Sequence, residues 1–197
     1  MSSLAYDFGL ELMMQQAASY LNLLRLRDQY TGDHSGRMKQ LARELCLHFN
    51  LSHEETQTIE VASYLHDLGK IGVPDPILRK PGPLTPEERE VMNGHPLAGW
   101  LALREMGEFR DVSEIILHHH EWYDGRGYPD GLAGEAIPFG ARIVAVLDAY
   151  DALISDRPYR RARPIAVAIE ELVQGKGTQF DPDVVDALLH VVKVRVH

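Results

Sequence analysis

The chain has 197 residues, which is the size of one ordinary globular domain. Hydrophobic residues make up 45% of it, too large a share for a disordered chain. The formal net charge of -9 excludes the broad basic face that binders of duplex nucleic acid carry, so we expect no DNA or RNA polymer as a partner.

Two features of the sequence bear on its compartment. No apolar run approaches the roughly 20 residues that cross a bilayer, and the N-terminal segment MSSLAYDFGLELMMQQ lacks the basic start of a signal peptide. Cys46 is the only cysteine, so no internal disulfide can form. We therefore predict a cytoplasmic protein with no membrane segment.

The first predicted element is a long helix over residues 4–29. Apolar side chains recur there at steps of three and four and form one stripe. The stripe consists of Leu10, Met14, Ala17, Leu21 and Leu24. Two interpretations are open: the stripe packs against its own domain, or it pairs with its copy in a homodimer, because heptad-like spacing suits a two-helix seam.

Capping signals mark the next helices. After a helix over 34–49, Ser52 and Glu55 form a capping-box pattern, and the helix that follows is predicted to run to Leu68 and stop at Gly69. Residues 69–84 contain several glycines and prolines and predict a loop. Thr85 is the expected N-cap of the next helix, with Pro86 in its first turn.

The C-terminal half also predicts helices. They cover 110–122 and 139–154, and a last one starts at 181–182, while 124–131 (DGRGYPDG) is a loop. No convincing run of strands is present. The predicted fold class is all-α: a single helical bundle over 30–197, with residues 1–29 as an N-terminal helical extension.

Several residues have side chains that suit metal ions. His66 and Asp67 are adjacent at the predicted end of a helix, and imidazole and carboxylate are ligands for zinc, iron or manganese. An isolated His-Asp pair means little by itself. Three consecutive histidines, 118–120, follow the apolar stretch VSEIIL, so at least two of them can point inward. The alternative is a polar patch on an exposed helix.

An acidic pair and two single histidines complete this set. Asp148 follows four apolar residues and is expected to face the interior, where a carboxylate needs a cation or several donors. Asp151 can serve as a local capping or salt-bridge residue. His34 and His95 each start a helical stretch and, taken singly, would be structural or exposed.

Cations accompany these residues in an otherwise acidic chain. Lys70 follows the His66-Asp67 pair by less than a turn. Arg157 and Arg160, in the segment DRPYRRAR, can hold phosphate oxygens, which the guanidinium fork suits. The alternative is a solvated surface run, which is the preferred interpretation for the two later arginines of the segment, at positions 161 and 163.

The order of these residues resembles that of the HD-GYP family, a branch of the HD-domain metal phosphohydrolases. The signature Gly127-Tyr128-Pro129 is present, and the matching segments cover most of residues 30–190. They are HDLGKIGVPDPILRKPGPLTPEE (66–88), NGHP (93–96), HHHEWYDGRGYPDGLAGEAIP (118–138), ARIVAVLDAYDALISDRPYR (141–160) and GTQFDP (177–182).

The resemblance implies an all-helical HD-domain fold and a phosphodiesterase. It implies hydrolysis of cyclic di-GMP to linear pGpG, GMP or both, by attack of a hydroxide that bridges two divalent transition-metal ions, iron or manganese. The family pattern would assign one metal to His34, His66, Asp67 and Asp148, and the other to His95, His119 and His120, with Asp67 bridging. Some members bind a third metal at the position of Tyr30, which is not a typical ligand, so we expect two.

The resemblance also implies roles around the metals. Lys70 would neutralise transition-state charge or assist the leaving oxygen. Arg157 and Arg160 would hold the substrate phosphates, and Tyr128 would shape the rim and contact a guanine. For Tyr128 the alternative is an ordinary turn, because Pro-Asp-Gly follows it.

Three other functions stay open at this point. The substrate could be another cyclic dinucleotide, such as cyclic GMP-AMP, or a nucleoside polyphosphate, which only pocket residues would discriminate. A His/Asp diiron centre could activate dioxygen, although Arg157 and Arg160 favour phosphate chemistry. The domain could also be a non-catalytic signalling module, but such modules lose ligands and this chain keeps them all.

Overall fold

The computed structural model describes residues 3–26, 30–156 and 161–195. The predicted all-α class is confirmed, because these ranges contain helices and two isolated bridges but no strand. The helices are α1 (Ser3–Arg25), α2 (Tyr30–His48), α3 (His53–Leu65), α4 (Asp75–Leu78), α5 (Pro86–Asn93), α6 (His95–Leu103), α7 (Arg110–His118), α8 (Phe139–Ile154), α9 (Ile165–Gln174) and α10 (Pro182–Arg195), with the short 3-10 helices η1 (Leu68–Gly72), η2 (Gly107–Phe109) and η3 (Gly134–Ala136). Within the described helices, none is long and apolar enough to cross a membrane.

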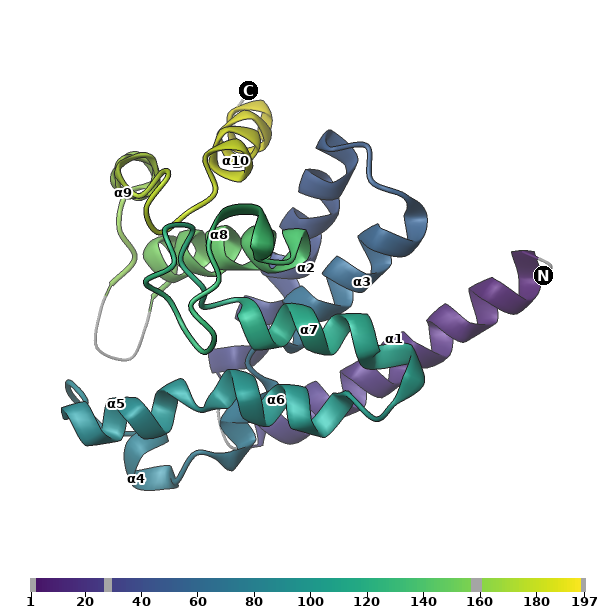
Figure 1. The fold of residues 1–197 in the computed structure, drawn as a ribbon, viewed down its shortest axis with the longest axis horizontal. Helices are drawn as coiled ribbons and strands as arrows, with labels where there is room; N and C mark the ends of the chain where they lie inside the picture. The colour runs from purple at the N-terminus through teal and green to yellow at the C-terminus, as the bar shows by residue number, and fades with distance from the viewer. Residues whose placement is uncertain (1–2, 27–29, 157–160, 196–197) are drawn as a thin grey trace.

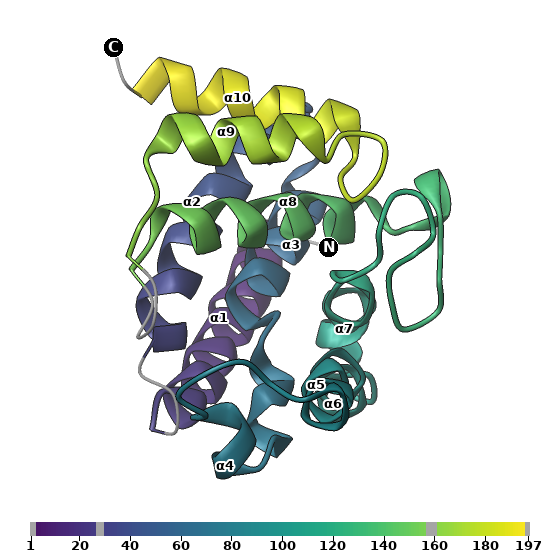
Figure 2. The same ribbon diagram turned by 90° about the vertical axis from the view of Figure 1, so that its left-hand side faces the viewer.

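The helices pack around a centre formed by α2, α3, α7 and α8, which contact one another (Figure 1). α9 and α10 lie together over α8, and α6 packs between η1 and α7 (Figure 2). One hydrophobic cluster runs through all of these layers. It includes Met38 and Leu45 of α2, Ile116 of α7, Leu147 of α8 and Leu172 of α9. The elements that carry the predicted ligands therefore share one core.

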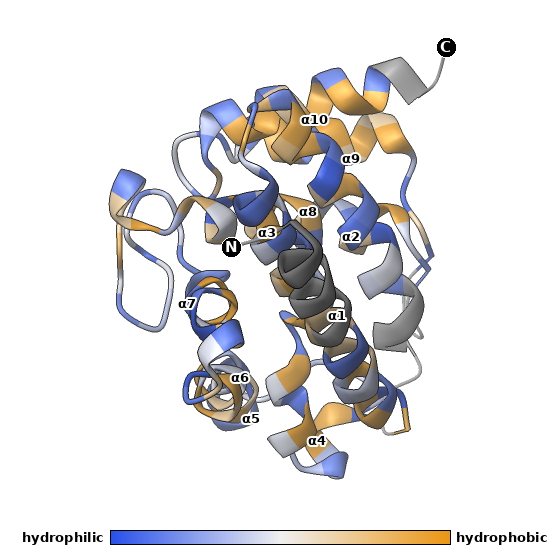
Figure 3. Ribbon diagram, turned by 90° about the vertical axis from the view of Figure 1, so that its right-hand side faces the viewer, coloured by the Kyte–Doolittle hydropathy of each residue, from blue (hydrophilic) through white to orange (hydrophobic). Residues whose placement is uncertain are grey.

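The C-terminal half of α1 is part of this core. Ala17, Leu21 and Leu24 are at most 1% exposed, and α1 contacts α2, α3 and η1 (Figure 3). For these residues the structure favours packing against the chain's own domain. The side chain of Leu10 lies outside the described residues. The boundary predicted at residue 29 stays a prediction.

The end of α3 differs from the prediction. The helix ends at Leu65, and His66 is its C-cap, followed by the 3-10 helix η1 instead of three more α-helical residues. Gly69 is needed for a close approach, because a Cβ there would lie 1.9 Å from the carbonyl oxygen of His95. The glycine therefore brings η1 against the start of α6, and the expected role as a helix stop is wrong.

The other local signals have mixed outcomes. The capping boxes of Ser52 and Thr85 are both formed. The predicted loop over 69–84 contains α4 and most of η1, and α7 ends at His118, earlier than predicted. The sequence analysis did not predict α9, which begins after Pro164. Ala168 and Leu172 of α9 are buried, and the helix contacts α8 and α10.

We expect Leu21→Ala to lower the free energy of unfolding by about 2–5 kcal/mol, because it removes a fully buried side chain and leaves a cavity. Leu101 of α6, which is 52% exposed, provides the control, and Leu101→Ala should change stability by less than about 0.5 kcal/mol. Urea unfolding followed by circular dichroism measures both. Equal effects of the two substitutions would show that α1 does not pack on the core in solution.

Candidate metal centre

Five helices bring the predicted ligands together, and most of the ligands lie at helix ends. His66 caps α3 and Asp67 follows it, His95 is the first residue of α6, and His119 caps the end of α7. His34 and Asp148 come from the interiors of α2 and α8. Four of these residues, His34, His66, His95 and His119, are at most 3% exposed. The centre is therefore built inside the bundle.

The first group of ligand atoms surrounds one point. His34 Nε2 lies 3.3 Å from His66 Nε2 and 3.3 Å from Asp148 Oδ1. Asp148 Oδ1 lies 3.9 Å from His66 Nε2, which is 3.4 Å from Asp67 Oδ2. Ligand atoms about 2.1 Å from a tetrahedral ion are separated by roughly 3.4 Å. The spacing of these atoms suits one ion.

The second group lies on the other side of Asp67. His95, His119 and His120 each offer a ligand atom, and these atoms lie within 4.8 Å of one another. Asp67 Oδ1 is 3.4 Å from His95 Nε2, whereas Oδ2 faces His66. One carboxylate thus presents a separate oxygen to each group, which is the geometry that a bridging ligand requires.

Backbone carbonyls fix the orientation of three of the imidazoles. His66, His95 and His119 each place Nδ1 against the carbonyl oxygen three residues earlier, at 3.0, 2.9 and 2.7 Å. A carbonyl only accepts hydrogen bonds, so Nδ1 must carry the proton. The lone pair of each ring is then on Nε2, the atom that faces the centre. The three rings are therefore oriented as metal ligands would need to be.

Burial keeps the second group neutral. It lowers the pKa of His95 to about 3 and that of His120 to about 4, and it holds the pKa of His119 well below the usual value. These imidazoles therefore offer lone pairs at neutral pH without first losing a proton. Neutral nitrogen ligands leave the charge of a bound cation uncompensated.

The first group is charged. Burial raises the pKa of Asp67, but interactions led by the positive charge of Lys70 outweigh it and hold the pKa well below the usual value. Burial lowers the pKa of His34, but hydrogen bonds to Asp148 and Asp151 outweigh it and raise the pKa to about 9. A cation that binds here must displace the proton on His34, so its affinity depends on pH.

Asp151 contacts a predicted ligand, whereas the sequence indicated only a local capping or salt-bridge role. It forms the salt bridge, since Arg37 donates to its two oxygens at 2.6 and 2.9 Å. It also accepts from His34 Nδ1 at 2.6 Å, which orients Nε2 toward the centre. The three-residue spacing from Asp148 puts both carboxylates on the same side of α8. This spacing is the feature of the sequence that could have placed Asp151 beside the predicted ligands.

The three consecutive histidines divide between two roles. His119 and His120 join the second group, whereas His118 points away, with Nε2 3.1 Å from Asp130 Oδ2. The ring of Tyr128 lies 5.1 Å from that of His120, with the planes tilted by 31°. The predicted signature loop therefore lies beside the second group.

Of the cations predicted near the site, the structure describes Lys70. Lys70 Nζ donates to Asp67 Oδ2 at 2.7 Å, so it lies at the bridging carboxylate. Arg157 and Arg160 lie outside the described residues. The surface interpretation holds for the two later arginines, since both are exposed and Arg163 pairs with Glu171.

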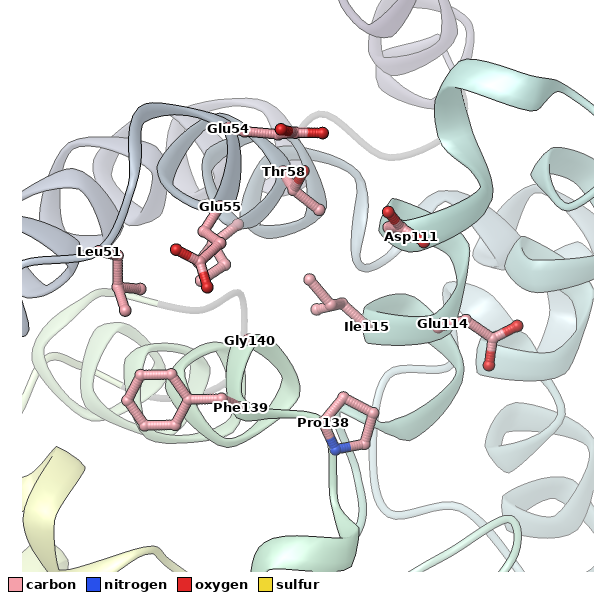
Figure 4. A pocket seen from close by; sticks show the side chains of 11 residues that line it. Leu51, Glu54, Glu55, Thr58, Asp111, Glu114, Ile115, Pro138, Phe139 and Gly140 are labelled. Carbon is pink, nitrogen blue, oxygen red and sulfur yellow. The ribbon is translucent and has the colours of Figure 1, made fainter.

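A separate cavity of about 370 Å³ lies between α3, α7 and α8 (Figure 4). None of its lining residues is a predicted ligand. Its carboxylates include Glu54, Glu55 and Asp111, which lie in the first turns of α3 and α7 and complement the helix dipoles there. The cavity is therefore not part of the metal centre.

Three comparisons identify related proteins. Over 168 residues the chain is 48% identical to the cyclic di-GMP phosphodiesterase response regulator RpfG of Xanthomonas campestris, a match that covers 84% of this chain and 44% of that protein. It is 38% identical over 170 residues to the 3'3'-cGAMP-specific phosphodiesterase 2 of Vibrio cholerae, covering 85% of this chain and 33% of that protein. The solved structure of Bd1817, an HDG"Y"P protein from Bdellovibrio bacteriovorus, has a TM-score of 0.70 at 19% identity, covering 98% of this chain and 65% of that one, which shows a shared fold.

The chain spans less than half the length of these two relatives. The resemblance to HD-GYP proteins predicted from the sequence is confirmed. Residues 18–184 match the profile of the family described as HD domain. Because this profile covers most of the chain, the protein belongs to the HD domain family.

Proposed function

We propose that this chain hydrolyses cyclic di-GMP at a two-metal centre and yields linear pGpG, GMP or both. The observation that carries the proposal is the position of Asp67, whose two oxygens each lie 3.4 Å from a different histidine group. The 48% identity to a protein named as a cyclic di-GMP phosphodiesterase supports this substrate. We also propose a cytoplasmic location, which agrees with the single cysteine and with the short apolar runs of the sequence.

The residues around Asp67 fit two divalent transition-metal ions, for which we propose iron or manganese. The Nε2 atoms of His95 and His119 are buried and have no hydrogen-bond partner among the described residues, so they are open to an ion. One ion would be held by His34, His66, Asp67 and Asp148, and the other by His95, His119 and His120, with Asp67 shared. When bound, such a pair would lower the pKa of a water molecule and stabilise the attacking and leaving oxygens of an in-line displacement.

The other residues bind and orient the substrate. Lys70 is 25% exposed beside Asp67, and we assign its ammonium group to transition-state charge or the leaving oxygen. Arg157 and Arg160 would hold the phosphates through their guanidinium groups. Tyr128 beside His120 would shape the rim and contact a guanine base.

Cyclic GMP-AMP is the second candidate substrate, because a relative at 38% identity is named for it. The metal ligands would be the same for both substrates, so only the residues that contact the bases would determine which dinucleotide is preferred. The ratio of kcat/KM for the two dinucleotides discriminates between them.

Lys70 beside Asp67 favours phosphate chemistry over dioxygen activation. The complete ligand set argues against a non-catalytic module.

The ligand assignment predicts that Asp67→Ala lowers the content of both metals, because one carboxylate serves two ions. Metal analysis of anaerobically purified protein should give about two transition-metal ions per wild-type chain and much less in the variant. Asp75→Ala removes a carboxylate that is 53% exposed on α4 and should leave the metal content unchanged. Full metal content and full turnover in Asp67→Ala would overturn the assignment.

Substrate binding is expected to weaken in Arg157→Ala and Arg160→Ala. Hydrogen bonds to charged groups contribute roughly 1.5–3 kcal/mol, so KM for cyclic di-GMP should rise about tenfold or more at unchanged metal content. The control is Arg161→Ala, which removes an exposed arginine of the same segment and should leave KM near the wild-type value. Unchanged kinetics in both Arg157→Ala and Arg160→Ala would make these arginines a solvated surface run.

We also propose a homodimer through the N-terminal helix. Because Ala17, Leu21 and Leu24 are buried within the chain, pairing must use other residues, and Leu23 and Leu26 are 53% and 81% exposed. Sedimentation equilibrium at micromolar concentration should give a dimer that dissociates in the double variant Leu23→Glu, Leu26→Glu. A wild-type monomer would end the dimer proposal.

A further inference from the structure

The signature loop is folded back onto the end of α7 that carries two of the predicted metal ligands. Tyr128 N donates to the carbonyl oxygen of His120 at 3.2 Å, and the two rings lie beside each other. A Cβ on Gly127 would lie 2.2 Å from the backbone nitrogen of Trp122, so the two backbone segments are in direct contact. This contact leaves no room for a side chain at Gly127.

Glu121 joins these two segments. It follows His120 directly, and its side chain is buried, with 3% of the residue exposed. Its Oε1 accepts hydrogen bonds from the backbone nitrogens of Asp130 at 2.7 Å and Gly131 at 3.0 Å. These two bonds are part-buried. A carboxylate that accepts from backbone amides forms charge-assisted bonds, which are about twice as strong as neutral ones. One side chain thus holds the far end of the loop against the ligand-bearing end of α7.

The other contacts hold different parts of the loop. Its base is bonded to the connection between α9 and α10, where Asp124 N donates to Thr178 O at 2.9 Å. His118 reaches Asp130 at 3.1 Å, but that carboxylate is more than half exposed and its contact is open to water. The stretch between Gly127 and Gly131 is thus held by the two amide bonds to Glu121, together with the bond from Tyr128 N to the carbonyl oxygen of His120.

We propose that Glu121 is a positioning residue for the reaction: it holds the 127–131 loop so that Tyr128 stays beside His120 at the rim of the metal centre. This inference rests on the proposed function, in which Tyr128 contacts the substrate. His119 is oriented independently, through its bond to the carbonyl oxygen of Ile116. Loss of Glu121 should consequently free the loop and weaken substrate binding while the metals stay bound.

Three substitutions separate geometry from charge. Glu121→Ala removes the acceptor, and Glu121→Asp keeps the charge but shortens the side chain by one methylene group, out of reach of the two amides. Glu121→Gln keeps an acceptor oxygen at the original length and loses the charge. The matched control is Glu135→Ala, which removes an exposed glutamate of the same connection between α7 and α8.

Limited trypsin digestion of the whole chain measures how accessible the loop is to cleavage and does not depend on enzyme activity. Arg126 is exposed next to Gly127, so cleavage after Arg126 reports release of the loop, and cleavage after Arg161 serves as the internal reference. We expect this cleavage to be about tenfold faster, relative to the reference, in the Ala and Asp variants. The Gln variant and the Glu135→Ala control should behave like the wild type.

Kinetics and metal analysis complete the test. In the Ala and Asp variants KM for cyclic di-GMP should rise about tenfold, with metal content unchanged and kcat changed less than KM. If Glu121→Ala fails to fold, Glu121→Asp carries the test. Unchanged cleavage after Arg126 in the Asp variant, or a Gln variant as impaired as the Asp variant, overturns the positioning role. A wild-type protein that binds metal but does not turn over cyclic di-GMP refutes the proposed function alone, since the trypsin result stands independently.

Discussion

The candidate centre depends on one carboxylate that faces two histidine groups at once. Asp67 can do so only because three chain segments meet within a few ångströms of it: the end of α3, the start of α6 and the end of α7. The contact between Gly69 and the carbonyl oxygen of His95 sets this approach, since a Cβ would lie 1.9 Å from that oxygen. Any larger residue would push α6, and His95 with it, away from Asp67.

Helix ends supply the rest of the geometry. The last carbonyl groups of an α-helix have no intrahelical partner and need donors from elsewhere. His66 and His119 donate from Nδ1 to such carbonyls, at Ser63 and Ile116. A single bond thus gives one of these carbonyl groups a donor and selects the tautomer whose Nε2 faces the centre. His34 lies inside a helix where no carbonyl is free, and Asp151 takes the place of the carbonyl.

The sequence predicted most of the helices better than it predicted their connections. Capping boxes are local, so Ser52 and Thr85 gave helix starts that the structure reproduces. The role of Gly69 depends on a contact with α6, which no local pattern reveals. The same holds for Asp151 and Glu121, whose partners lie 117 and up to 10 positions away in the chain. α9 was missed because its apolar face is short and follows a segment rich in arginine and proline.

The charges around Asp67 explain how an acidic chain can attract an anion. The chain as a whole carries a net charge of -9, and a phosphodiester would be repelled at most of its surface. Around Asp67 the balance is reversed, because burial keeps three of the imidazoles neutral and Lys70 adds a cation. Two divalent ions held by only two carboxylates would then leave a positive centre. For His95 and His119, the bond from Nδ1 to a backbone carbonyl also fixes which nitrogen faces this centre.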